Sequence, residues 1–271
     1  NNMATDYTGA DVYQKEFDPR SYLETYYNPK SGFLVKGGYL NFALKKYHET
    51  FTVRGVKGET LIDIGHGPSI YQDLSACESF REIIGAEYTD RNREYYEKTL
   101  RNEPGIFDWT SVIQAVCDLE GKGTTVEQKR EKLKNTVKKT IKGDVTKSNP
   151  VAPLVLPKAD CVMANLCLVA ACKDRDSYCN ALNNISFLLK VGGHLIIVEV
   201  LNSTFYWVGG KRFSSVAHNE EFIRSAITKT GYAIIDLEVI PRKYDEYDEE
   251  QYKMSDHDSI IFVLACKLRD I

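Results

Sequence analysis

The sequence has no apolar segment long enough to cross a membrane. A membrane-spanning helix needs roughly 20 consecutive, mostly apolar residues, and no run within these 271 residues approaches that length. The first 30 residues also lack the apolar stretch of a signal peptide. We therefore expect a cytoplasmic protein that does not act at a membrane.

An excess of positive charge is missing as well. The 35 Lys and Arg residues are balanced by 38 Asp and Glu residues, which gives a net charge of −3, and the two signs are interspersed along the chain. A surface that neutralises the phosphates of a nucleic acid requires clustered basic residues. Nucleic acid is therefore not expected as a partner.

Paired CxxC motifs, typical of a zinc site, are absent. The seven cysteines are an odd number, and their positions do not supply two pairs with zinc-like spacing. We expect reduced thiols, as is usual in a reducing compartment, and no metal site. The sequence also lacks HExxH, GxSxG and Ser/His/Asp patterns, so nothing in it predicts a covalent nucleophile.

What the sequence does contain is an alternation of short apolar runs and longer amphipathic ones. The apolar runs cover 60–64, 82–88, 159–164 and 193–201, and helical stretches separate them. This alternation is typical of βαβ units and a parallel sheet. Two further strand-like runs, 233–240 and 259–268, have no helix between them and predict an antiparallel pair at one edge. The charged stretch 120–140 predicts a solvated helix, and the acidic stretch 244–252 predicts an exposed loop.

The most informative stretch is LIDIGHGPSIY at 61–71. Ligands of open α/β sheets bind beyond the carboxyl ends of the strands, and glycines there let the backbone approach the ligand. Gly65 and Gly67 provide such glycines, but the third glycine of GxGxxG is missing, which disfavours a dinucleotide-dependent dehydrogenase. Glu87 ends the next strand, 22 residues after Gly65, where a carboxylate can bind a ribose diol. Asp144 and Asn165 follow, and either can bind an adenine amino group.

Several dispersed segments together resemble one family, the nicotinamide, phenylethanolamine and indolethylamine N-methyltransferases, most closely its nicotinamide branch. These segments are 17–27, 61–80, 107–121, 143–150, 159–172 and 213–215. The resemblance implies a Rossmann-like class I methyltransferase fold: a mostly parallel seven-stranded α/β sheet with an antiparallel C-terminal edge. It also implies one domain over 1–271, with an N-terminal helical cap at 1–58 and a core at 59–271. The implied cofactor is S-adenosylmethionine, and the implied partner is a small-molecule nitrogen nucleophile, methylated by a monomer.

The resemblance also transfers a cofactor site onto this chain, position by position. Tyr22 and Tyr27 belong to the cap, Glu87 matches the ribose-binding acid, and His66 and Asn165 replace a serine and a threonine of the nicotinamide branch. His66 is open to two interpretations, a contact with the methionine carboxylate or a local structural role. The full set of expected cofactor residues is Tyr22, Tyr27, Gly65, His66, Gly67, Tyr71, Glu87, Tyr88, Asn92, Asp144, Val145 and Asn165.

On the acceptor side, the resemblance makes Glu199 and Tyr22 the candidate catalytic residues. Glu199 stands where the nicotinamide branch has a substrate-facing aspartate, and Val169 replaces another acid nearby. Asp256 or Asp258, if either points inward, would favour a cationic amine instead. A non-catalytic protein with the same fold is a further alternative. The expected substrate-binding residues are Leu166, Glu199, Ser203, Tyr206 and Ser215.

Overall fold

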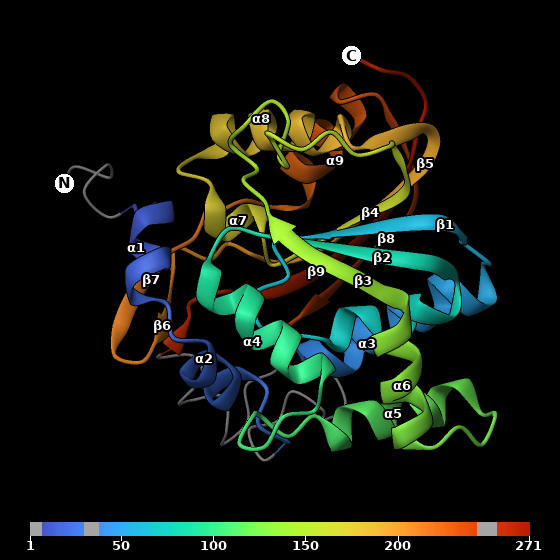
Figure 1. The fold of residues 1–271 in the computed structure, drawn as a ribbon. Helices are drawn as coiled ribbons and strands as arrows, with labels where there is room; N and C mark the ends of the chain where they lie inside the picture. Colours follow the sequence, from blue (N-terminus) through green and yellow to red (C-terminus); the bar gives the residue numbers. More distant parts are fainter. Residues whose placement is uncertain (1–6, 30–37, 243–253) are drawn as a thin grey trace.

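A central sheet of seven strands organises the chain, and helices cover both of its faces (Figure 1). This computed structural model describes residues 7–29, 38–242 and 254–271. The strand order is β3-β2-β1-β4-β5-β9-β8, in which β1 to β5 run parallel and β9 runs antiparallel to both of its neighbours. The strands are β1 Gly58–Ile64, β2 Phe80–Glu87, β3 Val137–Lys142, β4 Ala159–Asn165, β5 Leu189–Leu201, β8 Tyr232–Pro241 and β9 Ser259–Lys267. The predicted fold class, with its antiparallel edge, is confirmed.

Side chains alternate between the two faces of the sheet and form two apolar cores. One core includes Leu61 of β1 and packs against α3 and α5, whereas the other includes Ile62 and packs against α8 and α9. Figure 1 shows α8 and α9 on one side of the sheet and α3 to α6 on the other. The helices are α1 Ala10–Glu16, α2 Pro19–Tyr26, α3 Tyr39–His48, α4 Asp90–Leu100, α5 Thr110–Glu120, α6 Val126–Thr136, α7 Leu168–Ala171, α8 Arg175–Ser186 and α9 Glu220–Lys229.

The prediction of a single solvated helix over 120–140 is wrong in two respects. The helix α6 ends at Thr136, and Val137 begins β3, an edge strand that pairs with β2. The sequence hides this strand because Lys138 and Lys139, which are exposed, interrupt its apolar pattern. The helix is also not fully solvated, because Lys129 on its inner face is completely buried.

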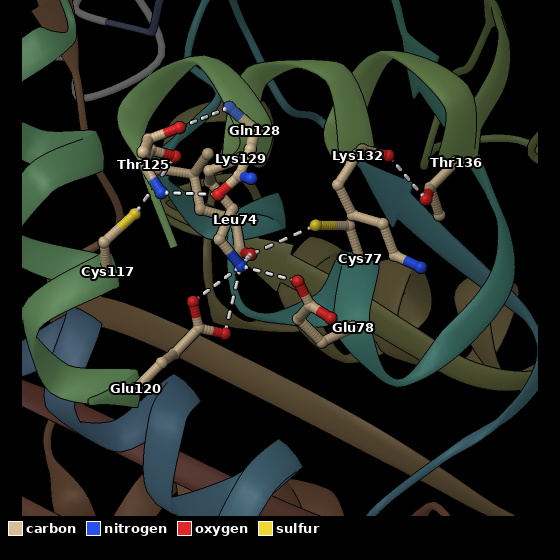
Figure 2. Close-up of polar contacts among 10 residues, drawn as sticks. All are labelled: Leu74, Cys77, Glu78, Cys117, Glu120, Thr125, Gln128, Lys129, Lys132 and Thr136. Carbon is tan, nitrogen blue, oxygen red and sulfur yellow. Dashed lines mark hydrogen bonds and ion pairs between the residues drawn. The ribbon is translucent and has the colours of Figure 1, made fainter. Parts of the chain in front are cut away.

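Lys129 forms the polar centre of the contact between α6, α5 and the loop after β1 (Figure 2). Its ammonium nitrogen lies 2.7 Å from Oε1 of Glu120, 3.0 Å from Oε1 of Glu78 and 3.2 Å from the carbonyl oxygen of Leu74. A charged group that is buried away from water is stable only when opposite charges and hydrogen-bond acceptors lie next to it. For the Lys129 ammonium, two carboxylates and a carbonyl oxygen are these partners. Lys129 therefore fixes α6 against the segment 74–78.

A small hairpin adds a feature that the sequence did not predict. Strands β6 (Phe205–Val208) and β7 (Lys211–Ser214) pair antiparallel and lie beside α1 and α2 (Figure 1). The ring of Phe213 lies 4.8 Å from that of Tyr13 in α1, and the hydroxyl of Tyr26 in α2 donates a 2.8 Å hydrogen bond to the carbonyl of Trp207. The hairpin thus holds the two N-terminal helices over the sheet edge.

Within the described residues, none of the helices combines the length and apolar character needed to cross a bilayer.

Candidate active site

The carboxyl ends of β1, β2 and β4 open onto a cavity of about 230 Å³, which α1, α2 and the β6–β7 hairpin help to enclose. The register places Ile64 of β1 beside Ala86 of β2 and Ala164 of β4, so the segments that follow these strands begin side by side. With the single exception of Glu199, every site residue expected from the sequence contributes to the lining. These residues are Tyr22, Tyr27, Gly65, His66, Gly67, Tyr71, Glu87, Tyr88, Asn92, Asp144, Val145, Asn165, Leu166, Ser203, Tyr206 and Ser215.

The two glycines after β1 are required for different structural reasons. Gly65 has φ +69° and Gly67 has φ +57°, a left-handed conformation that side chains disfavour. A Cβ atom on Gly65 would also lie only 2.2 Å from the sulfur of Cys167, whereas nothing lies within 4 Å of the corresponding position on Gly67. Gly65 is therefore required for close packing of the loop against the end of β4, and Gly67 for the turn itself.

Glu87 is held in place by two backbone amides at the tip of β2. Its Oε1 accepts a 3.0 Å hydrogen bond from the amide of Gly67, and its Oε2 accepts a 2.7 Å bond from the amide of Thr89. The side chain is buried, and it lines the cavity. Each carboxylate oxygen can accept more than one hydrogen bond. The carboxylate is therefore oriented in advance to accept two neighbouring hydroxyl groups, as in a ribose.

Three buried polar atoms at the cavity have no hydrogen-bond partner among the described residues: Oδ1 of Asn92, Nδ2 of Asn165 and Oγ of Ser215. The orientation of Asn165 is set by Tyr47, whose hydroxyl donates a 2.7 Å bond to the other amide atom, Oδ1. An unpaired buried polar group costs about 1–3 kcal/mol. These atoms fit a cavity whose ligand carries both donors and acceptors.

His66 has a local structural role in this structure; it also lines the cavity, and its expected contact with the cofactor stays a prediction. Its Nδ1 donates to the carbonyl oxygen of Gly67, and its Nε2 lies 2.6 Å from Oγ1 of Thr140 in β3. The ring also packs on Tyr96 at 4.3 Å between centroids, over a position where Gly85 leaves room for it. Because both ring nitrogens already have protein partners, the imidazole secures the glycine turn to β3.

Tyrosines from the cap and the loop after β1 form the roof of the cavity. The hydroxyls of Tyr22 and Tyr27 are 3.2 Å apart, that of Tyr27 lies 3.4 Å from that of Tyr71, and Tyr39 and Tyr71 are joined at 2.6 Å. The rings of Tyr27 and Tyr71 are stacked at 5.2 Å. Burial raises the pKa of the Tyr22 and Tyr71 phenols well above their usual range, so the roof is uncharged near neutral pH.

The other end of the cavity is lined by Leu166, Ser203, Tyr206 and Ser215. Leu166 has φ +54°, a strained backbone for a residue with a side chain, and such strain is concentrated at functional sites. The ring of Tyr206 is hydrogen-bonded through its hydroxyl to Tyr13. These residues provide two small hydroxyls and two apolar walls. Phe205, Trp207 and Phe213, which the sequence offers as further aromatic candidates, lie outside the lining.

Glu199 is the expected residue that the structure does not bring to the cavity. Its side chain is 2% exposed; Oε1 accepts a hydrogen bond from Tyr178 in α8, and Oε2 lies 3.5 Å from Nε2 of His218. Its expected contact with the acceptor is not formed in this arrangement and stays a prediction. Asp256 and Asp258 also lie outside the lining, because Asp256 binds the amide of Thr204 at 2.7 Å and Asp258 binds the side chain of Asn202.

Sequence reasoning missed several residues of the lining. His257 and Ser255 lie just before β9, and Tyr13 and Tyr39 come from α1 and α3. They belong to no motif and to no quoted segment of the family resemblance, so no local signal identifies them. The long-range contacts of the cap and the hairpin bring them to the site.

Comparison with known proteins agrees with this geometry. The family model described as "NNMT/PNMT/TEMT family" matches residues 5–268. The chain is 43% identical over 266 residues to human nicotinamide N-methyltransferase, covering 98% of both chains. It is 46% identical over 242 residues to rabbit indolethylamine N-methyltransferase, covering 89% of this chain and 92% of that protein.

Among solved structures, the fold resembles magnesium protoporphyrin IX methyltransferase from Synechocystis with bound SAH. The TM-score is 0.57 at 11% sequence identity, covering 95% of this chain and 97% of that one, so this likeness concerns the fold alone. The match to the family model extends over nearly the whole chain, and the relatives share more than 40% of their residues with it. The chain therefore belongs to the NNMT/PNMT/TEMT family of S-adenosylmethionine-dependent methyltransferases.

Proposed function

We propose that this protein transfers a methyl group from S-adenosylmethionine to the nitrogen of a small acceptor, either a nicotinamide-like pyridine or a small aromatic amine. The observation that carries the proposal is the carboxylate of Glu87, held by the amides of Gly67 and Thr89 at the cavity. The methyltransferase relatives, named for nicotinamide and for indolethylamine, support the nitrogen acceptor.

The residues present fit the cofactor. Glu87 would accept hydrogen bonds from the ribose hydroxyls, and Asp144 with Val145 would line the adenine. The unpaired atoms of Asn92 and Asn165 match the donors and acceptors of a nucleoside and an amino acid. The tyrosine roof would cover the methionine part and exclude water. When bound, S-adenosylmethionine supplies an electrophilic methyl group on its sulfonium sulfur.

On the acceptor side, the protein chiefly has to position a neutral nitrogen lone pair in line with the methyl group. Ser203 and Ser215 can orient a polar substituent by hydrogen bonds, while Leu166 and Tyr206 hold a flat ring between apolar walls. A covalent route through Cys167 is disfavoured, because burial raises the pKa of this thiol well above its usual range. The lining thus supports direct transfer.

Calorimetry tests the cofactor. S-adenosylhomocysteine should bind tightly and NAD should not, and Glu87→Ala should weaken binding of S-adenosylhomocysteine by about tenfold or more because two charge-assisted hydrogen bonds are lost. Glu94→Ala, on the exposed face of α4, is the control. Equal affinity in wild type and Glu87→Ala would remove Glu87 from the site.

Labelled S-adenosylmethionine tests the acceptor. A panel of nicotinamide, quinoline, tryptamine and phenylethanolamine should give at least one methylated product. If S-adenosylhomocysteine binds but no acceptor in the panel is methylated, the non-catalytic alternative is favoured.

Three further properties belong to this proposal. We propose a single methyltransferase domain over 1–271 with its cap at 1–58, a monomer, and a cytoplasmic location without membrane or nucleic-acid partners. All seven cysteines are free thiols, in keeping with a reducing compartment. Light scattering coupled to gel filtration tests the monomer, and microscopy of the tagged protein tests the location.

A further inference from the structure

His257 occupies the acceptor end of the cavity, near the residues that we expect to bind the methyl acceptor. It lines the cavity together with Ser203 and Tyr206. Two contacts fix its segment there: Ser255 forms an isolated β-bridge with Tyr206, and the amide of Asp258 donates a 3.1 Å hydrogen bond to the carbonyl of Leu201 at the end of β5. The function proposed above does not use this imidazole.

The surroundings of His257 determine which ring nitrogen carries the proton. Nη1 of Arg242 lies 3.3 Å from Nδ1 of His257, and a guanidinium nitrogen can only donate. Nδ1 is therefore the acceptor, and it also receives the hydroxyl proton of Ser255 at 2.8 Å. In a neutral imidazole the other nitrogen then carries the hydrogen. Burial, together with the charge of Arg242, lowers the pKa of His257 to about 3, so the ring is neutral near pH 7.

This tautomer leaves a donor for a ligand. None of the described residues accepts a hydrogen bond from Nε2 of His257, although the ring lines the cavity. The same Nη1 of Arg242 donates to the backbone oxygens of Ser255 at 2.9 Å and His257 at 3.1 Å. The ring and its backbone are thus held by the same guanidinium, and Nε2–H is fixed in direction before a ligand binds.

We propose that His257 determines acceptor specificity: its Nε2–H donates a hydrogen bond to an acceptor atom, such as a carbonyl oxygen, on a neutral heteroaromatic substrate. An ammonium group has no lone pair to receive this bond. This inference rests on the proposed function and selects, within it, the neutral pyridine class over the cationic amines.

The experiment compares two neutral pyridines that differ in one substituent. Nicotinamide carries a carbonyl oxygen, whereas 3-methylpyridine carries no hydrogen-bond acceptor besides its ring nitrogen. His257→Leu should lower kcat/KM for nicotinamide by about tenfold and leave that for 3-methylpyridine within about threefold, because only the first loses a hydrogen bond. His257→Asn, whose amide can both accept from Arg242 and donate to the substrate, should restore part of the nicotinamide rate.

A matched control is His194→Leu, the same substitution in β5 at a residue outside the cavity. Calorimetry with S-adenosylhomocysteine should give the same affinity for all variants, which shows that the cofactor half is folded. Equal losses with the two pyridines after His257→Leu would overturn the inference. A wild-type preference for tryptamine or phenylethanolamine over the pyridines would also overturn it, while leaving methyl transfer to nitrogen intact.

Failure of the proposed function has a different outcome, because the wild type would then methylate no acceptor. In that case the role of His257 is tested by measuring the affinity of nicotinamide for the complex of the protein with S-adenosylhomocysteine. Weaker binding to His257→Leu than to wild type and His194→Leu supports the role of His257, and unchanged binding refutes it.

Discussion

The hydroxyl of Tyr178 in α8 donates a hydrogen bond to Glu199 in β5, and both side chains are buried. This contact directs the carboxylate toward α8 and leaves it outside the cavity lining. An acid at this position could face the acceptor only after the hydrogen bond is broken. The pair therefore decides between a structural and an acceptor-facing role for Glu199.

We expect Glu199→Ala to lower the free energy of unfolding by about 1–3 kcal/mol, because the buried hydroxyl of Tyr178 loses its acceptor. Urea denaturation measures the change, with Glu221→Ala on the exposed face of α9 as the control. The affinity for S-adenosylhomocysteine should be unchanged. A variant as stable as wild type would contradict the structural role of this contact.

The acceptor-facing role inferred from the family resemblance adds a second measurement to the same variants. If the carboxylate reaches the acceptor, Glu199→Ala lowers acceptor turnover more than Tyr178→Phe does, because Tyr178→Phe retains the carboxylate. Equal reductions in kcat/KM would assign the effect to packing alone.

Tyr22→Ala should weaken binding of S-adenosylhomocysteine by about tenfold. The substitution opens the tyrosine roof, since Tyr22 packs on Tyr27 with ring centroids 5.5 Å apart and their hydroxyls 3.2 Å apart, and the loss of one large aromatic contact in a binding site typically exceeds 1 kcal/mol. Isothermal titration calorimetry measures the affinity. Tyr22→Phe retains the ring and should bind nearly as well; unchanged affinity in Tyr22→Ala would remove Tyr22 from the cofactor site.

Lys129→Met should lower the free energy of unfolding by about 3–5 kcal/mol. The substitution removes the positive charge that pairs with Glu120, whose side chain is 2% exposed. Removing one partner of a buried ion pair is strongly destabilising, because the other charge stays buried and unpaired. Adding Glu120→Gln should recover part of this loss, because the unpaired charge is removed. Denaturant titration measures all three proteins.

The exposed Lys132 on the same helix supplies the comparison (Figure 2). Lys132→Met should change stability by about 0.5 kcal/mol or less, as is usual for exposed positions. Similar effects of Lys129→Met and Lys132→Met would show that the buried cluster does not stabilise α6.

Acid should destabilise the protein partly through His257. Its pKa is lowered from 6.5 to about 3 by burial and by Arg242, so between these pH values the unfolded chain binds a proton that the folded chain does not. The free energy of unfolding therefore falls as the pH decreases through this window. His257→Asn cannot bind this proton, and its stability should fall less steeply between pH 7 and pH 4.

Circular dichroism during urea titration at several pH values measures both slopes. Because the other titrating groups are shared, the difference between the two slopes isolates His257. Parallel pH profiles for wild type and His257→Asn would contradict the lowered pKa of the partly buried His257 imidazole.

The sequence alone determined most strands of the sheet and which residues meet at the strand ends that open onto the cavity. Apolar runs separated by helical stretches are local patterns, and they predicted β1, β2, β4 and β5 correctly. The positions of Gly65 and Glu87 were predictable because the carboxyl ends of parallel strands lie at the same edge of a sheet. Residues that follow these strands therefore meet there, independently of the rest of the chain. The strand β3 was not predicted, because its lysines interrupt the apolar pattern.

The tertiary structure decided where the side chains of Glu199 and His257 lie relative to the cavity. The carboxylate of Glu199 points toward α8 because it contacts Tyr178 and His218. His257 lies in the cavity wall because its ring contacts Arg242 and Ser255. Tyr178, His218 and Arg242 are 15 to 21 residues away in the chain from the side chains that they hold, and Ser255 is two residues from His257. Periodicity specifies which residues face the core, but the direction of a polar side chain depends on its hydrogen-bond partners, and those are brought together only when the chain is folded.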